Sequence, residues 1–332
     1  MVNVPRFREE IRLPIFCVDD CIATFAKERN LIYQTLYLDE LRMNIAGSEG
    51  SYKINFSDDF LDSLRLYGGI RMEKISEEDC TVDGLKDFLG GNSSIIMEFK
   101  GTECPWDWRY QSVDWGNHTF LIENWDDRKN VFTGKDPFYH KEHIELKISQ
   151  LMKGYVEGKV ISGCPIEDHD IPGAFRSKLI DEKEYYSQLE HGLFLLFSAG
   201  NLRSVASALK EKDQFNDFGI ENCEMNVSLL NCVYSRLRYA ILLTFLAEKY
   251  HLSPIKESVV PVYIELSRLW EKIRNKVIKK FVSGSYTAEE RFEQLIRDVL
   301  HKEREAQMHL VKISERYGTE HCFLTETGTD RS

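Results

Sequence analysis

The chain has 332 residues, of which 43 are Lys or Arg and 54 are Asp or Glu, so its formal net charge is -11. An acidic chain repels phosphate backbones, which argues against nucleic acid as a general partner. With 42% hydrophobic and 12% aromatic residues, the chain can form a dense core, and its length favours two ordinary domains.

The predicted elements of the first half are short. "SSIIMEFKG", "HTFLIENW" and "KNVFTGKDPF" carry β-branched and aromatic residues between Gly, Asn and Asp, which is typical of strands. "NWDDRKN" predicts the hairpin turn between the last two strands, and Thr81 is placed to cap a helix. The expected helices are 17–29, 81–89 and 142–155, and the expected strands are 93–101, 118–125 and 129–138.

A turn-rich segment, "SGCPIEDHDIPG", predicts a linker after residue 161. Apolar residues then recur every three or four positions, as in Val233, Leu237 and Ile241, which predicts a helical bundle. The expected helices are 182–212, 221–250, 254–282 and 287–317. We therefore predict domains at 1–165 and 175–320, followed by a disordered tail at 321–332.

No membrane segment or secretory signal is expected. The start of the chain, "MVNVPRFREE", is charged and has no apolar core, and the longest apolar run, "YAILLTFLA", is too short to cross a bilayer. Eight scattered cysteines fit a reducing cytoplasm better than a disulfide framework.

"FCVDDCIA" places Cys17 at the expected start of a helix and Cys21 one turn later. The pair fits packed small residues, half of a metal site, or a nucleophile with a structural neighbour. Unpaired N–H groups and the helix dipole at such a position favour a thiolate. They also favour the oxyanion that forms when a carbonyl is attacked.

A nucleophilic cysteine needs a base, and the base needs an orienting group. His118 opens one predicted strand, and Asp136 lies near the end of the next. If "NWDDRKN" forms the hairpin, these two ends are adjacent, and His118 can bond to Asp136 beside the helix start. The sequence thus predicts a Cys17–His118–Asp136 triad.

Three segments carry a resemblance. "FCVDDCIA", "CPWDWRY" and "HTFLIENWDDRKNVFTGKDPFY" resemble the nucleophile helix, the loop before the histidine strand, and the histidine strand with its Asp-Pro hairpin in one bacterial family. That family is the papain-like cysteine acyltransferases of natural-product biosynthesis, which includes the butirosin aminoacyltransferase and the amide synthetase of closthioamide assembly. The bacteriocin-leader cysteine peptidases are similar at a greater distance. The resemblance covers residues 11–139.

The resemblance implies an α+β, papain-like N-terminal fold with a C-terminal helical region. Cys17 would attack an acyl thioester on the phosphopantetheine arm of a carrier protein, and a small amine would resolve the acyl-enzyme into an amide. His118 would move the proton and Asp136 would hold the imidazole. No ATP, metal or redox cofactor is needed. The family's hydrolases carry a Gln shortly before the cysteine, but "IRLPIFC" has none, which favours acyl transfer over proteolysis.

Other interpretations stay open. The same triad would serve a cysteine peptidase or thioesterase, and a non-catalytic binding protein could retain the fold. Residues of the types that bind zinc occur at four positions, but their spacing matches no closed structural zinc site: His140, His143, Cys164 and His169. A basic helical face, expected to be solvated, is an alternative docking patch for an acidic carrier protein; it comprises Arg268, Lys272, Lys276, Lys279 and Lys280. The aromatic residues Trp106, Trp108, Tyr110 and Trp115 are candidates to line a water-poor pocket.

Overall fold

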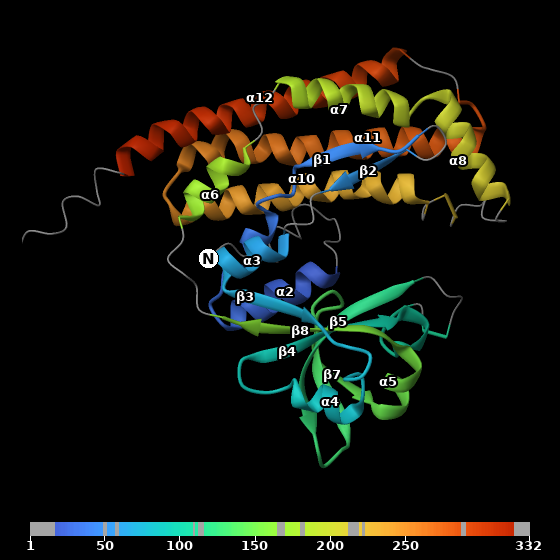
Figure 1. Cartoon of the computed structure of the whole chain (residues 1–332), viewed down its shortest axis with the longest axis vertical. Coiled ribbons are helices and arrows are strands. Elements are labelled where there is room, and N and C mark those ends of the chain that lie inside the picture. The colour runs from blue at the N-terminus through green and yellow to red at the C-terminus, as the bar shows by residue number, and fades with distance from the viewer. Residues whose placement is uncertain are drawn as a thin grey trace, which may run out of the picture. The chain divides into compact units, whose positions relative to one another are not determined.

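The computed structural model divides the chain into two compact units and confirms a mixed α+β chain with a helical C-terminal region (Figure 1). One unit comprises residues 1–36 and 61–169, and the other comprises residues 37–60 and 170–332. The residues described are 17–48, 52–56, 60–108, 110–111, 116–164, 170–179, 183–211, 219–220, 223–286 and 290–321. The tail predicted at 321–332 lies outside them apart from its first residue.

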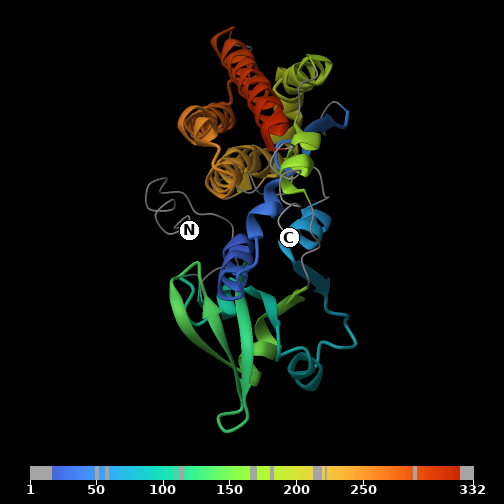
Figure 2. The same ribbon diagram turned by 90° about the vertical axis from the view of Figure 1, so that its left-hand side faces the viewer.

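The first unit is built on a six-stranded sheet in which all neighbouring strands are antiparallel (Figures 1 and 2). In spatial order the strands are β3 (Ile70–Lys74), β8 (Tyr155–Gly163), β4 (Ser93–Lys100), β5 (Asn117–Asp126), β6 (Val131–Asp136) and β7 (Lys141–Lys147). Four helices and a short 3-10 turn accompany it: α2 (Cys17–Glu28), α3 (Phe60–Gly68), α4 (Val82–Asp87), η2 (Gly101–Glu103) and α5 (Ile148–Gly154).

Alternate side chains of the central strands form the core of this unit. Phe99 of β4, Phe120 of β5 and Phe132 of β6 are fully buried in one apolar cluster, which Leu151 of α5 joins. Period-two alternation puts such residues on one face of a sheet. Helix α2 packs against β4 and β5, and its own apolar side, which includes Phe25, is buried.

Three predicted strands and two predicted helices of this unit are confirmed as β4, β5, β6, α2 and α4. Thr81 caps α4, because its hydroxyl accepts a hydrogen bond of 3.0 Å from the amide of Gly84. The helix predicted for 142–155 is wrong in its first half, where β7 runs to Lys147. Ile144 and Leu146 are buried there between exposed charged residues, which is a strand period that the prediction missed.

The second unit is a set of helices with a small two-stranded sheet. Its helices are α6 (Ile171–Lys178), α7 (Lys183–Leu196), α8 (Ala199–Glu211), α10 (Glu224–Lys249), the π-turn η3 (Ile255–Val259), α11 (Val260–Ser283) and α12 (Glu290–His321). The sheet pairs β1 (Met43–Ala46) with β2 (Lys53–Phe56), packs against α7 and α10, and was not predicted. The short 3-10 helix η1 (Tyr33–Tyr37) precedes β1 along the chain, and all of it except Tyr37 belongs to the first unit.

The single helix predicted for 182–212 is two helices, since α7 and α8 meet at a bend of 51°. The other long helices form as predicted, with bounds that differ by a few residues. By length and composition α10 could span a membrane, but 78% of its apolar window is buried inside the structure. That burial is the pattern of a core helix.

A buried ion pair joins α10 to α12. Arg236 is fully buried and contacts Glu303 twice, at 2.6 Å and 2.9 Å. The indole N–H of Trp270 on α11 donates to the same carboxylate at 2.6 Å. Each charge is therefore paired and hydrogen-bonded, which a charge in a helical core requires.

Candidate active site

Cys17 is the first residue of α2, as predicted. A residue at this position lies beside backbone N–H groups that have no partner within the helix, at the positive end of the dipole. The side chain of Cys17 is partly exposed, while Cys21, one turn later, is fully buried. The two cysteines therefore have different environments on one helix.

The β5–β6 hairpin positions the other two predicted residues. In its register Leu121 faces Lys135 and Ile122 faces Gly134. The two strands approach very closely at Gly134, where an added Cβ would lie 1.9 Å from the carbonyl oxygen of Leu121. This register brings His118, near the start of β5, to Asp136, the last residue of β6.

The two side chains are in direct contact. The Nε2 atom of His118 lies 2.6 Å from Oδ2 of Asp136, and the side chains are 2% and 0% exposed. Because Nε2 faces the carboxylate, the remaining ring nitrogen, Nδ1, is the one available for the hydrogen bond between His118 and Cys17. The structure thus brings Cys17, His118 and Asp136 together in that order.

Asp136 receives two further hydrogen bonds that fix its orientation. The indole Nε1 of Trp106 donates to Oδ2 at 2.6 Å, and the backbone amide of Tyr139 donates to Oδ1 at 3.2 Å. Together with His118, these donors hold the fully buried carboxylate in one orientation.

Aromatic rings surround His118. The ring centroids of Tyr139, Phe138 and Phe120 lie 5.0, 5.6 and 6.2 Å from the imidazole. These rings exclude water from the His118–Asp136 contact, and a lower local dielectric strengthens the attraction between the two groups.

The same contacts shift the titration of both reactive groups. For Cys17, burial is the largest influence and raises the pKa of the thiol, but hydrogen bonds from His118 and Thr119 and the charge of His118 outweigh it, so the pKa falls below 9.0. For His118, burial opposes the charged form most strongly, but Asp136 and Cys17 outweigh it and raise the pKa to about 9. Both shifts favour the charged forms, so the Cys17 thiolate and the His118 imidazolium stabilise each other.

Two buried cysteines, Cys21 and Cys104, have raised pKa values. Burial raises the pKa of Cys21 well above its ordinary value, and the nearby charges of Cys17 and Asp136 raise it further. Burial is also the largest influence on Cys104 and raises its pKa to about 12. The fold thus makes Cys17 more acidic and these two cysteines less acidic.

Two contributors to the site were not predicted in their observed roles. Thr119 hydrogen-bonds to Cys17 through both its side chain and its backbone, and Trp106 orients Asp136 rather than simply lining a pocket. The neighbouring aromatic residues Trp108 and Tyr110 are 67% and 40% exposed, and Trp115 lies outside the described residues. The period-two pattern of β5 could not have found Thr119, because it places the Thr119 and His118 side chains on opposite faces of the strand.

Across the described part of the chain, no group of three or more His, Cys, Asp and Glu side chains is placed to hold a metal ion. His143 contacts Glu145 at 3.3 Å, and His169 lies outside the described residues.

No protein-family model matches this chain, and no curated protein sequence matches it either.

Proposed function

We propose that the protein is a cysteine-dependent acyl or aminoacyl transferase whose first unit has a papain-like fold. The observation that carries the proposal is the Cys17–His118–Asp136 contact at a helix start, with the pKa of Cys17 lowered and that of His118 raised to about 9. A thiolate next to a protonated imidazole suits both halves of an acyl transfer. The resemblance of residues 11–139 to the papain-like acyltransferases adds support.

In the first half-reaction the Cys17 thiolate attacks the carbonyl carbon of a thioester. The C–S bond to the leaving thiolate breaks, and His118 gives that thiolate its proton. The products are an acyl-Cys17 thioester, a free thiol and a neutral imidazole. Backbone N–H groups at the start of α2 would bind the developing oxyanion.

In the second half-reaction an amine attacks the acyl-Cys17 carbonyl, and neutral His118 accepts the proton that the nitrogen loses. The Cys17 thiolate leaves, the amide departs, and the thiolate–imidazolium pair is restored. Asp136 stabilises the imidazolium throughout. Because a thioester is already activated, the chemistry requires no ATP, metal or redox cofactor.

The proposed donor is a thioester on the phosphopantetheine arm of an acyl or peptidyl carrier protein, and the proposed acceptor is a small amine. The setting that fits this chemistry is non-ribosomal biosynthesis of a natural product, such as an antibiotic, in the cytoplasm.

A direct test is intact-mass spectrometry after incubation with an acyl-loaded carrier protein. Wild type should gain one acyl mass, and Cys17→Ala should not; Cys21→Ala is the matched control and should be acylated like wild type. Equal behaviour of wild type and Cys17→Ala would refute the proposal.

A second stage separates transfer from hydrolysis, since the same triad would serve a peptidase or thioesterase. The acyl-enzyme is divided between buffer alone and buffer with a panel of amines. Amide formation that outruns release of free acid supports the transferase. Rapid release of free acid that amines do not divert identifies a hydrolase.

If the protein is a non-catalytic binding protein, iodoacetamide will alkylate Cys17 only slowly at neutral pH.

A further inference from the structure

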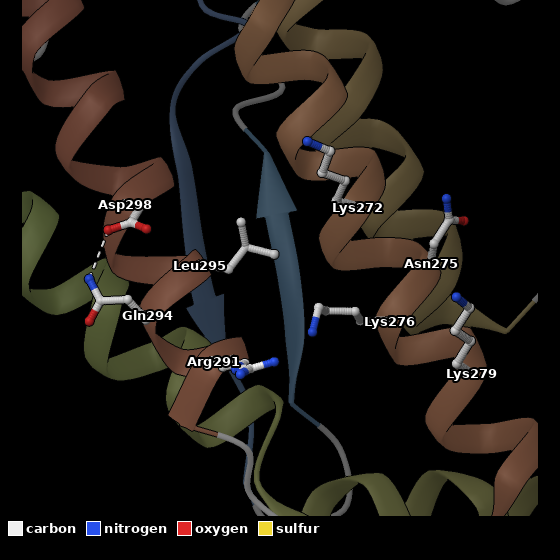
Figure 3. A pocket seen from close by; sticks show the side chains of 8 residues that line it. All are labelled: Lys272, Asn275, Lys276, Lys279, Arg291, Gln294, Leu295 and Asp298. Atoms are coloured by element: carbon white, nitrogen blue, oxygen red, sulfur yellow. Dashed lines mark hydrogen bonds between the residues drawn. The ribbon is translucent and has the colours of Figure 1, made fainter.

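A groove of about 540 Å³ lies between α11 and α12 in the second unit (Figure 3). Figure 3 shows Lys276 and Arg291 extending from opposite helices into the space between them, with Leu295 at its centre. The residues that line it are Lys272, Asn275, Lys276, Lys279, Arg291, Gln294, Leu295 and Asp298.

Positive charge dominates this groove. Four of its lining residues are cationic, and one, Asp298, is acidic. The Asp298 carboxylate accepts a hydrogen bond of 2.8 Å from Gln294 of its own helix. The groove thus carries three excess positive charges in a chain whose net charge is -11.

Three of the four cations have no acidic partner among the described residues. Among the residues that the structure describes, no carboxylate lies within ion-pair distance of Lys272, Lys279 or Arg291. Lys276 lies over the ring of Phe292, with its Nζ 5.9 Å from the centroid. Lys272, Lys279 and Arg291 therefore bring positive charge to the groove with no carboxylate of the described residues at ion-pair distance, and a bound anion would reduce the repulsion between them.

Two cations just outside the groove are ion-paired. Lys302 of α12 pairs with Glu265 of α11, and Arg297 pairs with Glu190 at 3.2 Å. Lys280, predicted to share the basic face, is instead 5% exposed and lies over Phe292. Lys302 and Arg297 are therefore ion-paired and Lys280 is buried, whereas Lys272, Lys279 and Arg291 of the groove are exposed.

We infer that this groove binds a compact oligophosphate, such as the di- or triphosphate moiety of a nucleotide. The volume lies within the range of about 300–1,000 Å³ that is common for small-molecule sites. Arginine and lysine on rigid helices suit adjacent phosphates, while an acidic protein would need a larger surface, on the order of 1,000 Å² or more. The inference depends only on the second unit and stands whether or not the proposed acyl transfer is correct.

Isothermal titration calorimetry of the full chain tests this site, with inorganic triphosphate and ATP as probes at low and high salt. We expect both to bind and to weaken as salt rises. The Lys276→Gln/Arg291→Gln variant should bind each at least tenfold more weakly. Arg268→Gln is the matched control, because Arg268 is exposed on the same helix but does not line the groove. If the first variant does not fold by circular dichroism, Lys272→Gln/Lys279→Gln replaces it, since both side chains are exposed.

Equal binding of triphosphate and ATP assigns the site to the phosphates, and tighter binding of ATP adds recognition of the nucleoside; both support the inference. It is overturned if neither probe binds at low salt, or if the groove variant binds like wild type. An equal loss in Arg268→Gln, which would show a general charge effect, also overturns it. So does tighter binding of a glutamate-rich peptide than of triphosphate, which would assign the groove to an acidic protein partner.

Discussion

Replacing Asp136 with Asn removes the charge that holds His118 protonated while keeping the size of the side chain. The pKa of His118 is about 9, against an ordinary value of 6.5, and after the opposing effect of burial Asp136 is the first contributor to that rise. This difference corresponds to about 3 kcal/mol in favour of the imidazolium. Without the carboxylate, burial should dominate, and His118 should be neutral at pH 7.

Loss of the positive charge on His118 should change the titration of Cys17. Burial is the largest influence on its thiol, and contacts with His118 are what chiefly oppose it. With a neutral imidazole the pKa of Cys17 should rise, so at pH 7 its alkylation should slow by on the order of a hundredfold.

The assay is the rate of iodoacetamide alkylation of Cys17 against pH, followed by intact mass. For wild type, the midpoint of the curve of alkylation rate against pH should lie below pH 9. Asp136→Asn should move this midpoint to higher pH. Asp87→Asn, which changes an exposed carboxylate of the same unit, is the control and should react like wild type. An unchanged midpoint in a folded Asp136→Asn protein would show that Asp136 does not set the charge of His118.

Three further changes test other contacts. Trp106→Phe removes a donor to buried Asp136 and should lower the free energy of unfolding in urea by about 1–3 kcal/mol; no change would mean that another donor replaces the indole. Cys21→Ala should keep the carbamidomethyl addition at Cys17 that is expected of wild type at pH 7, since the pKa of Cys21 is raised; loss of that addition would contradict the assignment. Arg236→Met should cost about 3–5 kcal/mol in urea, and adding Glu303→Leu should restore most of it; equal losses would argue against a buried pair.

The reactive residues could be predicted because each depends on local pattern. Helix α2 begins where a run of apolar and small residues follows Cys17, and two alternating segments joined by an acidic turn form the β5–β6 hairpin. Pairing across a short turn fixes which strand ends are adjacent, so the contact between His118 and Asp136 follows from the sequence.

Features that depend on distant partners could not be predicted. The indole of Trp106 reaches Asp136 across 30 positions of chain, and no spacing rule links them. The β1–β2 hairpin precedes the sheet of the first unit along the chain, yet it belongs to the second unit. The helix assigned to 142–155 failed because Glu142 and Glu145 favour a helix by propensity, whereas the burial of Ile144 and Leu146 favours a strand.

The docking of α2 on β5 has a consequence for the chain while it is being made. Cys21 and the strand residue it contacts, Thr119, are 98 positions apart. The ribosome must therefore synthesise β5 before Cys17 can contact His118. Until then Cys17 is an ordinary protonated thiol, which reacts slowly with electrophiles and oxidants. The nascent polypeptide is thereby protected from early reaction with electrophiles, because the Cys17 thiol becomes more acidic only after the tertiary structure has formed.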